Sequence, residues 1–361
     1  MAVTEAGVGL IPIHEVEATL RHLWQVEGMA GGARATTLNL LVVLPDVAAL
    51  DEAQETVEVV AAHHPSRAIF VVPDASTPDP GLAAEVRVFC PMPETTAFCC
   101  EYIVLHVRED AWPHVHSTVL PFLLPELPVS LWWERPLDGD DHLFPRLQAL
   151  ADVLVVDSAV TAEPEGLIQR LLAQSARFPW GCVDLVWARL LPWRELLAQT
   201  FDPLDRRPYL HNIDRVSLRV TPDAAGTAAA LYFMGWLASR LGWTPVSRWR
   251  RGAATRELSF RRGEEKVRVS ITRGQERSET PLLRARVHAG GVSPATFTIA
   301  QSDEPNHAEI TVQVGHTHVR QVVPARWPDR ATALSDALHI AGRDRVFEET
   351  LRLAERLITG A

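Results

Sequence analysis

Histidine pairs are the first residues of this 361-residue chain whose type and spacing could support chemistry. His114 with His116, and His316 with His318, are separated by one residue, and on a strand this spacing puts both imidazoles on one face, as a metal site needs. Neither pair has a third ligand close in sequence, and the first pair falls in a helical pattern, where such residues diverge. We therefore expect no metal site, and structural or surface roles for these histidines.

Cysteines offer a second possibility, because Cys99 and Cys100 adjoin at the start of an expected strand. A redox switch needs exposed thiols of low pKa, whereas cysteines buried in a sheet are inert, and we favour the buried reading. Walker, GxGxxG, GxSxG and HExxH signatures are all absent from the positions where they would act. We predict that the chain has no catalytic constellation, is not an enzyme and binds no cofactor.

Tryptophans are more informative, because eleven occur and several gather in two segments. Residues 123–133 bracket an expected strand with prolines and end in two adjacent indoles, which must face opposite sides of the strand. One indole would pack inside while the other reaches a domain seam or the surface. Residues 184–195 combine tryptophan with arginine, the types enriched at interface hot spots. The candidate partner-binding residues are Trp132, Trp133, Trp187, Arg189, Trp193 and Arg194. The alternative, left open, is that they join two domains internally.

Charge and composition narrow the class of protein. The net charge of −10 argues against general nucleic-acid binding, and the most apolar stretch, 115–133, contains three prolines and a glutamate, so it does not predict a membrane span. With four cysteines and no basic leader, the simplest compartment is a reducing cytoplasm. Residues 240–277 hold 11 basic and 4 acidic residues, a net of +7. That segment is either the solvated face of strands or a site for an acidic partner or a phosphate.

Hydrophobic periodicity divides the chain into two parts. Residues 1–160 alternate expected helices with short β-branched strands, which predicts an α/β domain with a mostly parallel sheet and flanking helices. Residues 161–361 begin with linking helices, change to period-two strands from Glu257 and end in helix, which predicts an α+β domain with an antiparallel sheet. The run Thr221-Pro222-Asp223 is expected to start a helix with proline at its first position, and Gly242 is expected to end it.

Four segments together resemble the OpcA family, the glucose-6-phosphate dehydrogenase assembly proteins of bacteria. They are the run His64–Ile69, the proline-bracketed segment that closes in Trp132-Trp133, the run Leu150–Ser158, and the run Asp184–Gln199 that continues to Phe201-Asp202. The last is the most specific, because a long string of tryptophan, arginine and proline rarely recurs by chance. Family members more often have asparagine where Val186 stands and arginine where Val153 stands.

The resemblance implies a non-catalytic protein that promotes assembly or activation of glucose-6-phosphate dehydrogenase, feeding the oxidative pentose phosphate pathway and NADPH supply. It carries no catalytic residue to this chain. The main alternative is a sugar-phosphate- or nucleotide-binding enzyme or sensor that uses the N-terminal α/β domain, with His64 and Arg67 near a strand start as candidate ligand-binding residues. A third possibility is a scaffold that binds the dehydrogenase without altering its kinetics.

Overall fold

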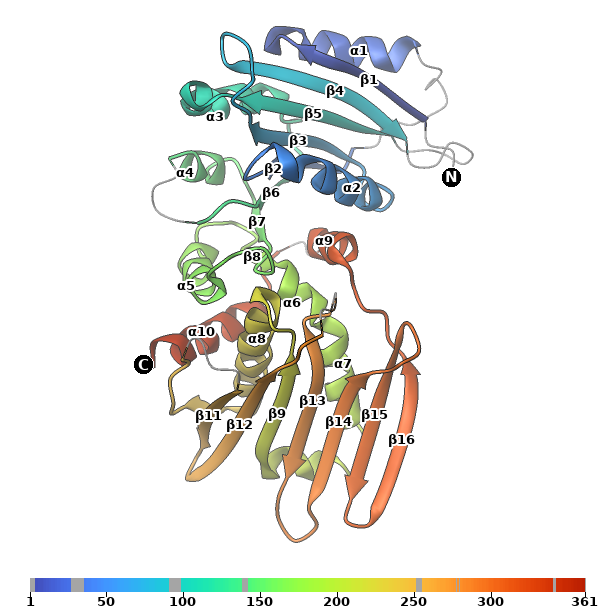
Figure 1. Cartoon of the computed structure of the whole chain (residues 1–361), viewed down its shortest axis with the longest axis vertical. Helices are drawn as coiled ribbons and strands as arrows, with labels where there is room; N and C mark the ends of the chain where they lie inside the picture. Colours follow the sequence, from blue (N-terminus) through green and yellow to red (C-terminus); the bar gives the residue numbers. More distant parts are fainter. Residues whose placement is uncertain are drawn as a thin grey trace. The chain divides into compact units, whose positions relative to one another are not determined.

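The computed structural model describes residues 4–26, 36–90, 99–137, 142–250, 255–276, 278, 280–339 and 342–360 (Figure 1). Its contacts divide the chain into two compact units, each built around one sheet. The first unit comprises residues 1–156, 176–183 and 330–343, and the second comprises 157–175, 184–329 and 344–361. Instead of the single boundary expected at residue 160, the two units interleave along the chain.

The first unit contains an eight-stranded sheet in the order β1-β4-β5-β3-β2-β6-β7-β8. Its strands are β1 (Thr4–Ile11), β2 (Leu38–Val43), β3 (Ser66–Pro73), β4 (Leu82–Cys90), β5 (Cys100–Val107), β6 (Val129–Trp133), β7 (Val153–Val156) and β8 (Cys182–Asp184). The pairs β5–β3, β3–β2, β2–β6 and β6–β7 are parallel. Counted along the chain, the parallel strands and β8 lie in the order third, second, first, fourth, fifth, sixth, which is the doubly wound order of dinucleotide-binding folds.

The prediction of a mostly parallel sheet holds for these central strands and fails at one edge. β4 pairs antiparallel with β5, and β1 pairs antiparallel with β4. Only residues 91–99 separate β4 from β5 in sequence, fewer than a parallel crossover needs, which agrees with their antiparallel pairing. Every described side chain of β2 and β5 is buried, as expected for central strands covered on both faces.

The helices of the first unit connect these strands. They are α1 (Val16–Val26), α2 (Leu50–Ala61), α3 (Val115–Val119), α4 (Phe144–Gln148) and α9 (Arg330–Leu338). α1 packs on β4 and β1, whereas α9 packs on α2. α9 belongs to this unit although its residues follow the second sheet in sequence. Its Arg330 guanidinium forms an ion pair with Glu52 at 2.9 Å and a second with Glu134.

The second unit contains a sheet in the order β10-β11-β12-β9-β13-β14-β15-β16. Its strands are β9 (Ile213–Val220), β10 (Thr244–Pro245), β11 (Thr255–Arg262), β12 (Glu265–Arg273), β13 (Leu282–Ala289), β14 (Ala295–Gln301), β15 (His307–Val314) and β16 (Thr317–Pro324). All pairs are antiparallel except β12–β9. That pair is parallel because the chain between its strands includes helix α8, which returns it to the same end of the sheet.

Helices cover one face of this sheet and leave the other open. They are α5 (Pro164–Ser175), α6 (Leu185–Arg189), α7 (Leu191–Thr200), α8 (Ala224–Leu241) and α10 (Arg345–Thr359). α8 packs on β9 and β13, α7 on β14, and α5 and α10 on α8 (Figure 1). Along β9, Val216 and Leu218 are buried towards these helices, while Arg215, Ser217 and Arg219 alternate with them and are exposed.

Helix α8 is the centre of this helical layer. The helix starts two residues later than predicted: Asp223, not Thr221, caps its N-terminus, where the carboxylate accepts the Gly226 N–H at 3.0 Å, and Pro222 precedes the cap. As predicted, Gly242 ends the helix in the left-handed conformation at φ 66°. Every residue from Gly226 to Ala238 is buried. Gly235 lies so close to α10 that a Cβ atom there would stand 2.6 Å from the Thr350 carbonyl oxygen.

No helix in the described part of the chain is both long enough and apolar enough to cross a lipid bilayer.

Candidate functional site

Two of the segments that carry the family resemblance meet in a buried group of polar side chains inside the second unit. We call this group the motif cluster; it consists of Asp157, Ser158, Asp184, Arg189 and Tyr232. The Asp184 carboxylate is at its centre and is fully buried. One oxygen accepts hydrogen bonds from the Ser158 hydroxyl at 3.0 Å, from the Ser158 N–H at 3.2 Å and from the Val186 N–H at 2.9 Å. The other accepts the Tyr232 hydroxyl at 2.7 Å.

Asp184 is also the N-cap of helix α6. Its carboxylate accepts the Val186 N–H, which has no acceptor within the helix. Burial, followed by repulsion from Asp157, raises the pKa of Asp184 to about 6. Arg189, four residues after Leu185, places its guanidinium 3.1 Å from an Asp157 carboxylate oxygen. The cluster therefore joins Asp157 and Ser158 to the start of α6 through hydrogen bonds and an ion pair in a water-excluded site.

The tryptophans of the same segment are packed on the helices of the second unit. The Trp187 indole stacks on Phe347 with ring centroids 5.2 Å apart, and its N–H donates to Asp344 at 3.0 Å. The Arg194 guanidinium also lies over the Trp187 indole, with its central carbon 3.4 Å from the ring centroid. Burial lowers the pKa of Arg194 to about 10. Such a cation–ring contact is strongest when it is desolvated, so it stabilises α6, α7 and α10 as one layer.

Trp193 is also fully buried, 4.9 Å from the Trp327 ring centroid. In the first unit, Trp132 and Trp133 lie on opposite faces of β6, and both are buried, at 0% and 1% exposure. Arg330 covers Trp132, and Phe144 packs against Trp133 at 5.0 Å between centroids. The expectation that one of the two indoles reaches the surface is wrong, because β6 is a central strand with both faces covered.

All six candidate partner-binding residues therefore lie inside their own units. Arg189 is 7% exposed, the four tryptophans are buried, and Arg194 is half-buried. None presents an aromatic ring to solvent. Any contribution of these residues to partner binding acts through the elements that they hold in place.

His64 and Arg67 lie at the amino end of β3, although ligands of doubly wound sheets bind beyond the carboxyl ends of strands. Arg67 is 2% exposed, and its nitrogens contact Glu101 at 2.6 Å, Glu17 at 2.7 Å and the Phe122 carbonyl oxygen at 2.9 Å. His64 contacts the Ser335 carbonyl oxygen on α9 and the His339 ring, which follows that helix directly. Protein groups thus already occupy the donors predicted to bind a ligand.

A cleft of about 1080 Å³ lies at the carboxyl ends of β3, β5 and β6. Asp74 stands at its edge and accepts bonds from Ser76 at 2.6 Å and from His106 at 3.0 Å, and the Ser76 hydroxyl is the main cause that lowers the pKa of Asp74. The arginines of the cleft are engaged by the protein. Arg108 pairs with Asp79 and Asp110, Arg135 lies over the Trp112 ring, and Arg146 donates to the Pro113 carbonyl oxygen.

The remaining chemical candidates are dispersed. Among the described residues, no group of three or more His, Cys, Asp or Glu side chains is placed to hold a metal ion. His114, His316 and His318 are exposed. Cys99 is disulfide-bonded, which corrects the interpretation that it is a buried thiol, whereas burial raises the pKa of the free Cys100 thiol to about 11.

Known sequences identify the family. The profile described as "Glucose-6-phosphate dehydrogenase subunit N-terminal domain" matches residues 57–173, and the corresponding C-terminal domain profile matches residues 180–351. The chain belongs to the OpcA family. The first match includes Asp157 and Ser158, and the second includes Asp184, Arg189 and Tyr232, so the motif cluster draws on both matched regions.

Three cyanobacterial relatives carry the name "Putative OxPP cycle protein OpcA". The protein of Synechocystis sp. is 40% identical over 194 residues, that of Nostoc punctiforme 37% over 191 residues, and that of Synechococcus elongatus 33% over 211 residues. These matches cover 53%, 52% and 56% of this chain, and 40%, 40% and 46% of the respective relatives. The chain thus matches less than half the length of each relative.

Solved structures with a similar fold include KijD10, a 3-ketoreductase from Actinomadura kijaniata in complex with NADP and TDP-benzene. Two of its crystal structures align with TM-scores of 0.51 and 0.52 at 10% and 12% identity, over 90% of this chain and 98% and 97% of that one. At this identity the likeness concerns the fold alone.

The turn where such a fold holds a dinucleotide does not fit that ligand in this chain. After β2, a glycine-rich turn would bring backbone N–H groups to the pyrophosphate. Here Leu44-Pro45-Asp46 follows, and the Asp46 carboxylate accepts the Ala49 N–H at 3.2 Å. Asp51 and Glu52 add negative charge to the first turn of α2, where they would repel a phosphate. The glycine-rich run that begins at Gly28 precedes β2 and lies outside the described residues.

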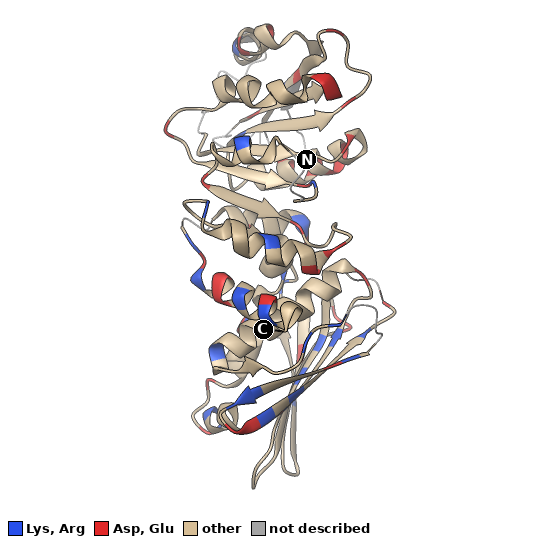
Figure 2. Ribbon diagram, turned by 90° about the vertical axis from the view of Figure 1, so that its left-hand side faces the viewer, with Lys and Arg blue, Asp and Glu red and all other residues tan. Residues whose placement is uncertain are grey.

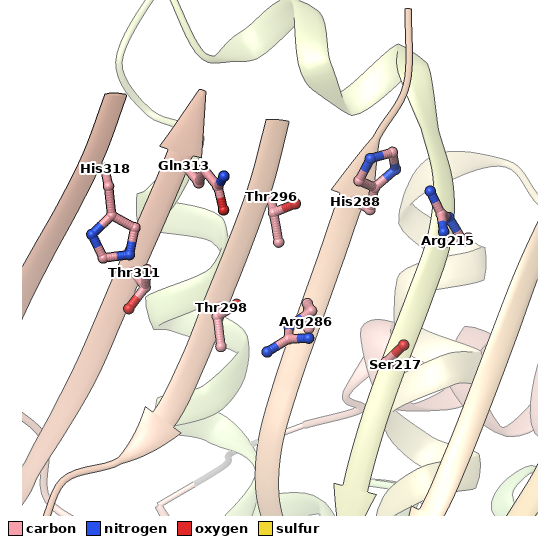
Figure 3. Close-up of a pocket in the computed structure, with 9 residues that line it drawn as sticks. All are labelled: Arg215, Ser217, Arg286, His288, Thr296, Thr298, Thr311, Gln313 and His318. Carbon is pink, nitrogen blue, oxygen red and sulfur yellow. The ribbon is translucent and has the colours of Figure 1, made fainter. Parts of the chain in front are cut away.

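The open face of the second sheet is the feature that the sequence prediction left undefined. Its exposed cations form what we call the basic face: Arg215, Arg219, Arg261, Lys266, Arg268, Arg284 and Arg286. Figure 2 shows these strands marked with basic residues. A shallow depression of about 450 Å³ lies among Arg215, Arg286, His288 and His318 (Figure 3). The net charge of residues 240–277 signalled part of this face, but not its contributions from β9 and β13, which only the strand register reveals.

Proposed function

We propose that the chain is a non-catalytic, cytoplasmic assembly factor and activator of glucose-6-phosphate dehydrogenase. Through that enzyme it would support the oxidative pentose phosphate pathway and the supply of NADPH. The observation that carries the proposal is that two successive family profiles match residues 57–173 and 180–351. The descriptions of both profiles name glucose-6-phosphate dehydrogenase. The names of the cyanobacterial relatives point to the same pathway.

The polar groups of the first unit support a role without catalysis. The Asp46 carboxylate occupies the turn after β2, where a nicotinamide dinucleotide would need backbone N–H groups with no carboxylate beside them. The charge of Arg67 is neutralised by Glu101 and Glu17. The titratable groups of the motif cluster are closed off from solvent and bonded to one another. A buried carboxylate that meets no substrate stabilises the protein rather than a transition state.

A protein without an active site raises the activity of a partner by binding its active oligomer more tightly than its inactive form. The equilibrium then shifts by the difference in affinity and by no more. In this account the six family-matching residues, Trp132, Trp133, Trp187, Arg189, Trp193 and Arg194, position the elements that meet the dehydrogenase.

The test is a titration of the same organism's glucose-6-phosphate dehydrogenase with the purified chain, with size-exclusion chromatography of the mixture. We expect a saturable rise in activity and co-elution. Co-elution with unchanged kinetics would indicate a scaffold, and no effect on either would contradict the proposal.

The cleft at the carboxyl ends of β3, β5 and β6 is the observation that favours the rival function, a sugar-phosphate or nucleotide sensor. That function predicts a saturable rise in melting temperature with glucose 6-phosphate or NADP when no protein partner is present. Because the arginines of this cleft already have protein partners, we expect no such rise.

A further inference from the structure

Cations of the basic face lie directly beside one another on neighbouring strands, an arrangement that destabilises the sheet. Arg215 on β9 lies beside Arg268 on β12, and Arg219 lies opposite Arg284 on β13. Lys266 lies opposite Arg261 in the β11–β12 hairpin. Like charges in directly opposed positions destabilise a sheet, so folding alone does not account for three such pairs on one face.

Several of these cations are unpaired. Arg219 forms an ion pair with Glu276 at 2.7 Å. By contrast, no acidic side chain among the described residues pairs with Arg215, Arg268 or Arg286. Because arginine stays protonated and presents a planar fork of donors, these three groups are available for carboxylates from outside.

The surface between the cations is polar and contains the depression described above. Around Arg215 and Arg286 the depression is lined by the hydroxyls and amide of Ser217, Thr298 and Gln313 (Figure 3). From β11 to β16 there are six strand spacings, and the strands are about eight residues long, so the whole open face of the sheet measures about 29 Å by about 26 Å, or about 750 Å². The basic face lies on β11, β12, β9 and β13 and makes up about half of this area. One side of a standard protein interface is about 800 Å², whereas a small ligand would use only part of this area.

We propose that the basic face is the docking surface for an acidic surface of glucose-6-phosphate dehydrogenase. This inference rests on the function proposed above and assigns the contact to a specific face. A second copy of this chain does not fit, because two basic faces brought together repel each other. An acidic protein surface relieves the repulsion within the three like-charge pairs and also gains long-range attraction before contact.

The experiment compares Arg215→Glu/Arg286→Glu with a control of equal charge change, Arg21→Glu/Arg177→Glu. Both control residues are exposed and belong to the first unit. Affinity for the dehydrogenase is measured by titration calorimetry at low and at physiological ionic strength, alongside activation. We expect the basic-face variant to bind about tenfold more weakly or worse and to lose the salt dependence of the wild-type chain, while the control stays within about twofold.

Melting temperature separates loss of docking from loss of folding. Arg215→Glu places a carboxylate beside Arg268, so the variant should melt at the same or a higher temperature than the wild-type chain. If this folded variant binds and activates like the wild type, the docking surface is wrong and the proposed function stands. If the wild-type chain does not bind the dehydrogenase at all, the proposed function fails, and this inference fails with it.

A small anion is the other ligand that this chemistry could accept. Inorganic phosphate and glucose 6-phosphate are therefore tested without the dehydrogenase. A saturable thermal shift that Arg215→Glu/Arg286→Glu abolishes, together with retained activation by that variant, would assign the face to a small anion and overturn the proposal.

Discussion

The motif cluster and the basic face differ in almost every physical respect. The cluster is buried, its polar groups are bonded to one another, and all of its residues except Tyr232 belong to the segments that resemble the family. The face is exposed, several of its charges are unpaired, and it has no contiguous sequence motif because its residues come from separate strands. The comparison teaches that the most recognisable residues of this chain build its interior, while the residues suited to meet a partner are recognisable only after strand register places them together.

The largest effect should come from opening the motif cluster. Asp184→Ala leaves the Tyr232 hydroxyl and the N–H groups of Ser158 and Val186 buried without an acceptor, so we expect a loss of about 3–5 kcal/mol in the free energy of unfolding, measured in urea. As a control, Asp46→Ala removes an exposed cap with one bond and should cost about 1 kcal/mol. Equal losses in the two variants would remove the distinction between a buried cluster and a surface cap.

The second prediction concerns pH. The folded-state pKa of Asp184, about 6, lies above the ordinary value of 3.8, so folding favours its protonated form. This stabilisation is fully present below the ordinary pKa and is lost as pH rises through about 6. The stability of the wild-type chain relative to Asp184→Asn should therefore fall by about 3 kcal/mol between pH 4 and pH 7. Taking the difference between the two free energies of unfolding removes the contribution of carboxylates that titrate elsewhere in both proteins. A difference that stays constant between pH 4 and pH 7 would contradict the raised pKa of Asp184.

A smaller loss is expected where α8 meets α10 on the covered side of the sheet. Gly235→Ala puts a Cβ atom 2.6 Å from the Thr350 carbonyl oxygen, which must move, at a cost of about 1–3 kcal/mol. Gly166→Ala on α5 is the matched control, because its Cβ would meet only ordinary contacts, the nearest at 3.4 Å. That variant should be stabilised by about 0.5–1 kcal/mol, as measured by thermal melting. Similar shifts of the same sign would show that the packing of α8 is looser than described.

The smallest change in stability should come from the basic face. Arg215→Glu/Arg286→Glu is expected to alter the free energy of unfolding by no more than about 0.5 kcal/mol, and in the stabilising direction. A loss above about 2 kcal/mol would mean that these arginines maintain the fold, and the contrast with the motif cluster would disappear.

The sequence was sufficient for features that depend on local chemistry. A helix start near Thr221-Pro222-Asp223, the stop at Gly242 and the period-two strands after Glu257 follow from backbone preferences and alternation, and the structure has each of them, although the cap itself is Asp223. Long-range pairing was harder to predict. The residues of β1 include Gly7 and Gly9, which weaken a strand pattern, and nothing in β6 shows that both of its faces are covered.

The candidate site was predicted less well for the same reason. Tryptophan occurs both at interfaces and in cores, and arginine can pack over its ring in either place, so residue type could not separate the two roles for Trp187 and Arg194. The basic face needs the register that aligns β12, β9 and β13, and a one-residue slip would send each of its arginines to the opposite face.

The most direct test of the central claim is a linkage measurement. The dissociation constant of the chain from glucose-6-phosphate dehydrogenase should be determined under conditions that favour the active oligomer and under conditions that favour the inactive form. We predict tighter binding to the active oligomer, by the same factor with which the chain shifts the equilibrium between the two forms. Equal affinity for both forms would contradict the account, because such a partner cannot move that equilibrium however tightly it binds.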